Sequence, residues 1–305
     1  MRNTLLCSLS FILALSVDAA EDFRRVDGDT HTELIYNWPD QGIRFQVNNT
    51  DLPHKQSLPR YSAERMKLHV RNQLILKAAA LQQPGLRIKF SPANLPLEVQ
   101  VEGKDPKQVE QVLAALNKAQ QEAQQKNLTA NYFYSLKLPT GERVVIPDHG
   151  QFFTESLAPL KPVAAAFTAQ YGDSNIRQIA NKIALWVQRI PYQNLSNRQE
   201  SAGDGYSPPL RVLLDHRGDC DSKAVLFAAV MKNIFPKLNL QIIYFRDHAI
   251  IGAKIPPLTG ELTVDIAGVT YLLIDPTGPA QLAIGQLSEE YAQAISNNHF
   301  TSRPL

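Results

Sequence analysis

Apolar residues recur at spacings of three and four in several long segments of the chain. These segments are 59–81, 105–126, 174–190, 224–234 and 287–297. Such spacing places the apolar side chains on one face of a helix, so each segment is predicted to be helical. Asp105 followed by Pro106 is a typical helix start, and Pro84-Gly85 is a typical stop.

Other segments alternate apolar and polar residues with the period of two that is typical of strands. They are 42–47, 87–90, 97–102, 130–138, 143–146, 240–246, 248–255, 262–266 and 269–275. Thr140-Gly141-Glu142 is a turn that joins two of them into a hairpin. Residues 20–39 are polar, and we expect them to be partly disordered. Helices and strands together predict an α+β fold.

The segment from Pro147 to Pro162 contains three prolines and one glycine and is predicted to be an irregular linker. We therefore expect an accessory α+β domain at 20–158 and a catalytic domain at 159–305. Residues 1–19 are predicted to be a signal peptide, because Arg2 precedes an apolar run that ends in small residues. That run is too short to span a bilayer. The mature protein is expected in the periplasm or secreted, with no membrane span.

Composition excludes several function classes. The chain has 305 residues, of which 44% are hydrophobic and 20% charged, and its net charge is +2. This is ordinary globular composition without a basic cluster, so nucleic acid is not an expected partner. The histidines outside the candidate site lack the spacing of a zinc site; they are His31, His54, His69, His149 and His299.

Cys220 is the residue with the clearest chemistry. The only other cysteine, Cys7, is expected to leave with the signal peptide. Asp219 and Asp221 flank Cys220, so deep burial of this segment is unfavourable. Cys220 also begins a predicted helix, whose N–H groups and partial positive charge lower the pKa of a thiol. The sequence therefore predicts a nucleophile that is held as a thiolate.

Two further residues complete a predicted triad. His248 lies in a strand-like run and Asp275 closes another, so they are a candidate base and the carboxylate that orients it. Three other residues are alternative members of the triad. His216 lies before the cysteine turn and is expected to be exposed, Asp247 is expected to face away from His248, and Asp265 ends a different strand.

Four segments of the C-terminal half, in order, resemble the transglutaminase-like superfamily of papain-like cysteine enzymes. They are IALWVQRIPY, PLRVLLDHRGDCDSKAVLFAAVM, DHAIIGAKI and YLLIDPTG, within residues 176–278. The resemblance implies a papain-like core, in which the cysteine helix packs on an antiparallel sheet. It also implies that Cys220 is the nucleophile, His248 the base and Asp275 the orienting acid. Gln193, which follows IPY, is a candidate second donor to the oxyanion.

One departure from the family pattern bears on the activity. Cross-linking animal transglutaminases carry an aromatic residue directly after the cysteine, where this chain has Asp221. The G-D-C-D form looks more like bacterial members, several of which are exported peptidases. Asp219 and Asp221 also suggest a calcium site, by similarity to the calcium-dependent proteases of this superfamily. The simpler interpretation is that Asp219 caps the helix and Asp221 favours its positive end. No other cofactor is expected.

These observations predict an exported cysteine hydrolase that acts on peptide or isopeptide bonds through a thioester. Two alternatives stay open: acyl transfer to an amine, as in a transglutaminase or amide ligase, and a binding or scaffold module that has lost turnover. The expected partner is a protein or peptide substrate, and the accessory domain is a candidate for binding a partner protein.

Overall fold

The computed structural model describes residues 22–38, 41–51, 60–92, 95–195 and 205–305. The described residues form eight α-helices and twelve strands, and every strand pairing between them is antiparallel. The fold is therefore α+β, as predicted. The predicted signal peptide at 1–19 lies outside the described residues. In the part of the chain that the structure describes, no helix combines the length and apolarity needed to cross a membrane.

The largest sheet is five-stranded and curls into half a barrel. Its strand order is β10-β11-β9-β8-β12. The strands are β8 (Leu240–Tyr244), β9 (Ala249–Ala253), β10 (Thr263–Ile266), β11 (Val269–Ile274) and β12 (Thr301–Pro304). Apolar side chains of β8, β9 and β11 point alternately to its two faces. One face packs against α7 (Cys220–Ile234), and the other packs against α8 (Glu289–Ser296).

Helix α7 is the centre of the main core. All residues from Ser222 to Met231 are buried. Four helices surround α7 on the side away from the sheet, namely α3 (His149–Ser156), α4 (Lys161–Tyr171), α5 (Ile176–Arg189) and α6 (Pro209–Asp215). The expectation that 147–162 is an irregular linker was therefore wrong. Asp148 accepts a hydrogen bond from the Gln151 N–H and so begins α3 in spite of the nearby prolines.

A second sheet covers the opposite side of these helices. It consists of β1 (Phe23–Asp27), β2 (His31–Trp38) and β3 (Gln41–Asn48). Tyr36 and Phe45 pack edge-on against Trp186 of α5, with ring centroids 5.3 and 6.3 Å apart. The prediction of disorder for 20–39 was wrong for the described part, because this contact buries every second residue of β2.

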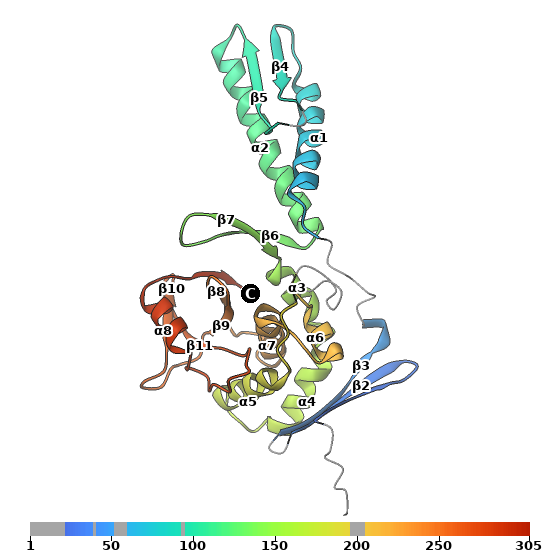
Figure 1. Cartoon of the computed structure of the whole chain (residues 1–305), viewed down its shortest axis with the longest axis vertical. Helices are drawn as coiled ribbons and strands as arrows, with labels where there is room; N and C mark the ends of the chain where they lie inside the picture. Colours follow the sequence, from blue (N-terminus) through green and yellow to red (C-terminus); the bar gives the residue numbers. More distant parts are fainter. Residues whose placement is uncertain (1–21, 39–40, 52–59, 93–94, 196–204) are drawn as a thin grey trace, which may run out of the picture.

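An arm projects from this body (Figure 1). It consists of α1 (Ala63–Leu81), β4 (Leu86–Phe90), β5 (Val99–Gly103) and α2 (Pro106–Ala130), and the short helix η1 (Asn49–Asp51) precedes it. Ser62 and Asp105 cap the two long helices through their side-chain oxygens. The arm has its own apolar core, built on Val70, Leu74 and Leu116.

The hydrophobic cores do not follow the expected boundary between 158 and 159. Residues of β2 and β3 share one core with α4, α5 and α7, and so do Leu136 and Phe152. Only the arm has a separate core within the described part of 20–158. Between arm and body lies a hairpin of β6 (Phe133–Lys137) and β7 (Arg143–Pro147), the one predicted around Thr140-Gly141-Glu142.

Candidate active site

The local sequence around Cys220 places its thiol at the first position of α7. Asp219 is the N-cap, and its carboxyl group accepts the Ser222 N–H at 3.3 Å, which confirms the capping interpretation. A Cβ atom on Gly218 would lie 3.2 Å from side-chain atoms of Lys223 and Val212. Glycine therefore allows the turn to pack closely against the helix that it begins.

His248 and Asp275 are brought together from two neighbouring strands. His248 directly precedes β9 and Asp275 directly follows β11, and β9 and β11 pair in the sheet. The Nε2 atom of His248 lies 2.9 Å from Oδ2 of Asp275. With the proton on Nε2, the Nδ1 atom is left as a proton acceptor. The Tyr291 ring stacks on His248 at 4.5 Å between centroids and limits its rotation.

Cys220 lies next to this pair. The backbone N–H of Ala249, the residue after His248, donates a hydrogen bond to the cysteine sulfur. Cys220 and His248 line the same pocket, which has a volume of about 400 Å³. The three predicted residues thus meet at the edge of the five-stranded sheet where α7 begins.

A buried set of hydrogen bonds holds Asp275 in place. The N–H and Oγ1 of Thr277 donate to Asp275 Oδ1 at 3.0 and 2.6 Å, and Gln188 Nε2 donates to its carbonyl oxygen at 2.7 Å. Burial alone would raise the pKa of Asp275, but the hydrogen bonds and charge of His248 and the hydrogen bonds of Thr277 outweigh it and lower the pKa. Asp275 is therefore ionised at neutral pH and can stabilise a protonated His248.

The pKa of the Cys220 thiol differs from the expectation. Burial and the carboxyl groups of Asp221 and Asp219 raise the pKa of Cys220 to about 12. The backbone N–H groups of Ala249 and Asp221 lower this pKa, but they contribute less. Cys220 is therefore a neutral thiol in the resting protein. This environment opposes the predicted thiolate, because burial raises the pKa of the thiol and the two flanking carboxyl groups bring negative charge to the helix start.

A second histidine, which sequence reasoning missed, also lies beside Cys220. His149 is buried at the start of α3, and its Nε2 atom lies 2.8 Å from Oδ2 of Asp221. Its Nδ1 atom lies 2.8 Å from the Tyr244 hydroxyl group. Burial would raise the pKa of Asp221, but His149 holds it below its usual range. Burial and the adjacent Asp221 raise the pKa of Asp219, which donates its proton to Asp221.

This network predicts that removal of the flanking charge activates the thiol. The double variant Asp219→Asn and Asp221→Asn keeps the cap and the acceptor for His149 but removes the negative charge that the pair carries. We expect the pKa of Cys220 to fall by at least one unit, and alkylation by iodoacetamide at pH 7 to become about tenfold faster. Asp247→Asn is the control, because it removes an exposed carboxylate from the rim of the same pocket. Equal rates in the double variant and the wild type would contradict the prediction.

Of the three alternatives to the triad, His216 and Asp265 do not line the Cys220 pocket, whereas Asp247 does. His216 is half-buried and stacks on Phe23 with ring centroids 3.9 Å apart, and burial lowers its pKa to about 4. Asp265 is exposed and accepts a hydrogen bond from Thr270. Asp247 lines the pocket and does not face away from it, because it lies in the turn between β8 and β9.

Gln193 is close to the cysteine turn through its backbone. Its N–H donates to the carbonyl oxygen of Gly218 at 3.0 Å, beside a parallel bridge between Tyr192 and Gly218. Its Oε1 atom is buried. The residues on either side, Tyr192 and Asn194, line the pocket. A role in binding the oxyanion stays a prediction.

The calcium hypothesis does not fit the donor set around Cys220. Ca²⁺ takes six to eight oxygen ligands. Asp221 is bonded to His149, and Asp219 is bonded to the Ser222 N–H and to Asp221. Within the described residues, no group of three or more histidine, cysteine, aspartate or glutamate side chains is arranged to hold a metal ion. The carboxyl oxygens of Asp219 and Asp221 are thus engaged with neighbouring groups and do not form a calcium cage.

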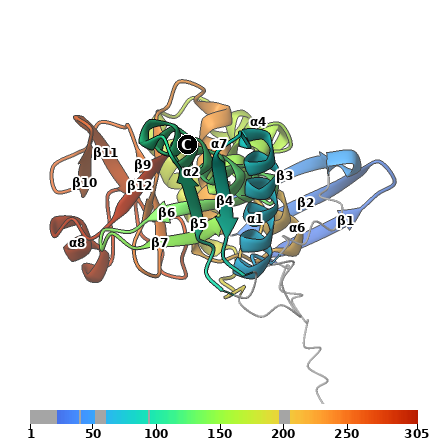
Figure 2. The same cartoon turned by 90° about the horizontal axis from the view of Figure 1, so that it is seen from above.

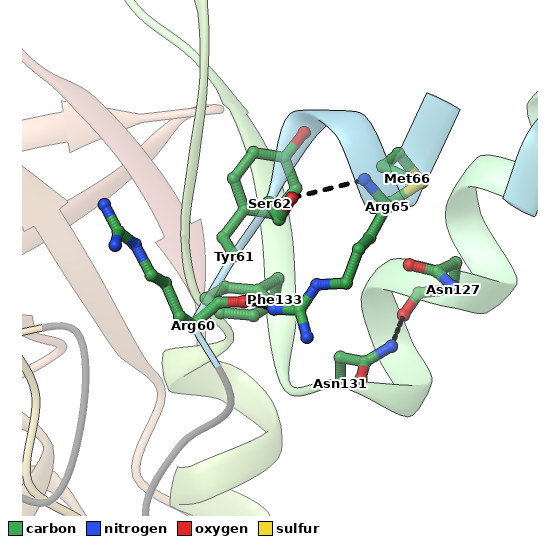
Figure 3. A pocket seen from close by; sticks show the side chains of 8 residues that line it. All are labelled: Arg60, Tyr61, Ser62, Arg65, Met66, Asn127, Asn131 and Phe133. Atoms are coloured by element: carbon green, nitrogen blue, oxygen red, sulfur yellow. Dashed lines mark hydrogen bonds between the residues drawn. The ribbon is translucent and has the colours of Figure 1, made fainter. Parts of the chain in front are cut away.

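Two other pockets lie at the foot of the arm. One has a volume of about 140 Å³. Figure 3 shows that Arg60 and Arg65 lie near Tyr61 and Phe133 in it. The second, of about 580 Å³, lies between the arm helices and the β6–β7 hairpin. No cysteine, histidine or carboxylate is among the described residues that line these two pockets, so the candidate chemistry is sought in the Cys220 pocket.

Comparison with known proteins adds no family assignment to this geometry. Searches with this sequence and structure found no matching protein-family model, no matching curated protein and no matching solved structure.

Proposed function

We propose that this protein is a cysteine hydrolase that cleaves peptide or isopeptide amide bonds through a thioester intermediate. The observation that carries the proposal is the hydrogen-bonded His248–Asp275 pair beside the thiol of Cys220 in one open pocket. A nucleophile, a base and a group that orients the base are the parts that acyl transfer requires.

Because the resting thiol is neutral, His248 acts first as a general base. Nδ1 of His248 takes the thiol proton while the sulfur of Cys220 attacks the carbonyl carbon and forms the S–C bond. The ionised Asp275 stabilises the imidazolium that results. The imidazolium then donates its proton to the amide nitrogen, the C–N bond breaks, and the amine leaves.

Water completes the cycle. His248 removes a proton from a water molecule that attacks the thioester, and it returns the proton to the sulfur as the acid leaves. The backbone N–H of Cys220, at the first position of α7, is the proposed donor to the oxyanion. One such donor contributes about 3 kcal/mol in well-studied enzymes.

The arrangement of elements also supports a papain-like core of the transglutaminase-like kind. The cysteine helix packs on an antiparallel sheet, and the histidine and aspartate lie at the ends of two neighbouring strands. The four sequence segments that resemble that superfamily supply these same residues. Membership of the transglutaminase-like superfamily is therefore part of this proposal.

The arm is the proposed surface for a partner protein. Helix α1 exposes Leu68, Ile75 and Leu76, with exposed fractions of 58%, 43% and 66%. Exposed apolar residues on a projecting helix are typical of surfaces that bind other proteins.

The proposal is tested with a peptide library made by digesting a whole proteome. The library is incubated with the wild-type protein and with Cys220→Ala, in the presence of a dansyl-labelled alkylamine. New peptide N-termini that require Cys220 support a hydrolase. Dansylated peptides without new N-termini would instead identify a transferase. If neither product forms, and His248→Ala leaves alkylation of Cys220 unchanged, the chain is a binding module and the proposal fails.

A further inference from the structure

Part of the wall of the Cys220 pocket belongs to the β6–β7 hairpin. Leu136 pairs with Val144 and Tyr134 pairs with Ile146 across the hairpin, so these four side chains lie on one face. Leu136, Val144 and Ile146 of this face line the pocket, and Leu138 continues it beyond β6. We call Leu136, Leu138, Val144 and Ile146 the apolar wall.

The other face of the same hairpin lines a different pocket. Ser135, Arg143 and Val145 alternate with the wall residues and line the pocket beside the arm helices. Successive residues of a strand point to opposite faces, so neighbours in β7 serve different pockets. Val144 lines the Cys220 pocket, and Val145 lines the pocket beside the arm.

Among the described residues that line the rest of the pocket, the charged groups either have partners already or lie at the rim. Asp219 and Asp221 share a proton and are bonded to each other, to the helix start and to His149. At the rim, Arg246 and Asp247 carry opposite charges. The apolar wall is therefore a surface on which an apolar substrate side chain can gain binding energy.

We propose that the Cys220 pocket selects a peptide that presents an aliphatic or aromatic side chain next to the attacked carbonyl group, seated against the apolar wall. This inference rests on the proposed function and adds its substrate class. The volume of about 400 Å³ is in the range of pockets that enclose small ligands.

The test uses acetylated dipeptide chloromethyl ketones that differ only in the residue next to the ketone: leucine, phenylalanine, lysine or aspartate. The sulfur of Cys220 forms a bond to the methylene carbon, chloride leaves, and the thiol proton passes to His248. The inactivation rate of each ketone is divided by the rate with iodoacetamide, and mass spectrometry identifies the modified residue. We expect the leucine and phenylalanine ketones to react at least about tenfold faster than the other two.

Two adjacent valines give a matched pair of variants. Val144→Asp is expected to lower the relative rate of the leucine ketone about tenfold and to raise that of the lysine ketone. Val145→Asp, one residue further along β7, is expected to change neither ratio. If circular dichroism shows that Val144→Asp is unfolded, Val144→Thr replaces it, with an expected loss of about threefold.

The outcomes separate this inference from the proposed function. Ketones that react equally whatever their side chain, at rates that still depend on His248, overturn the apolar wall alone. The same holds if Val145→Asp has the larger effect of the two variants. Ketone reactions at Cys220 that are unaffected by His248→Ala overturn the proposed function instead.

Discussion

Replacement of Asp275 by asparagine is expected to lower the rate of amide cleavage by about four orders of magnitude, as the equivalent change does in serine proteases. Thr277 donates two hydrogen bonds to Oδ1, so the amide oxygen of the variant keeps that position. The amide nitrogen then faces Nε2 of His248. It can only donate, so the imidazole proton moves to Nδ1, the atom that must accept the thiol proton.

The measurement is the cleavage rate of a peptide from the library, with Asp265→Asn as the control. Asp265 also lies in a strand of the same sheet, but its side chain is exposed and bonded to Thr270. The control is expected to cleave at the wild-type rate. A loss of less than tenfold in Asp275→Asn, or equal losses in both variants, would show that Asp275 does not set the tautomer.

Replacement of Lys223 by methionine is expected to reduce the free energy of unfolding by about 3 kcal/mol. Lys223 is fully buried, and its ammonium group donates to the carbonyl oxygens of Ile190, at 2.7 Å, and of Thr277. Methionine fills a similar volume but leaves these buried carbonyl groups without the ammonium donor. Urea denaturation followed by circular dichroism measures the loss.

Lys232→Met is the matched control on the same helix. Lys232 is only partly buried and donates to the carbonyl oxygen of Leu238 at 2.9 Å, so its replacement is expected to cost less than about 1 kcal/mol. A second readout uses pH. Burial lowers the pKa of Lys223 from 10.5 to about 8, so the unfolded state binds more protons between these values. The stability lead of the wild type over Lys223→Met therefore grows as the pH rises from 8 to 10. A constant lead would contradict the assigned environment.

The sequence located the parts of the candidate site that depend on local signals. The turn before Cys220 and the cap at Asp219 follow from residues that are neighbours in the chain. Apolar runs in the sequence predicted the strands that His248 and Asp275 adjoin. Those two strands pair in the sheet, so the two residues lie at the same edge of it. Helices α3 and α4 were not predicted, because the prolines and the glycine between 147 and 162 favour an irregular segment. Packing against α7 stabilises both helices nevertheless.

The charge state of the thiol could not be predicted in the same way. A helix start favours a thiolate, and this effect is visible in the sequence. Burial and the orientation of two carboxyl groups oppose it, and both depend on segments far along the chain. His149 is the clearest example, because it lies 72 residues before Asp221 and no spacing or motif connects the two.

The hydrogen bonds of the Lys223 ammonium group make the alignment of the candidate site depend on complete folding. Lys223 lies one turn after Cys220 in α7. Its ammonium group donates to the carbonyl oxygen of Ile190, directly after α5, and to that of Thr277, two residues after Asp275. A newly made chain has none of these alignments until α5, α7 and β11 have docked.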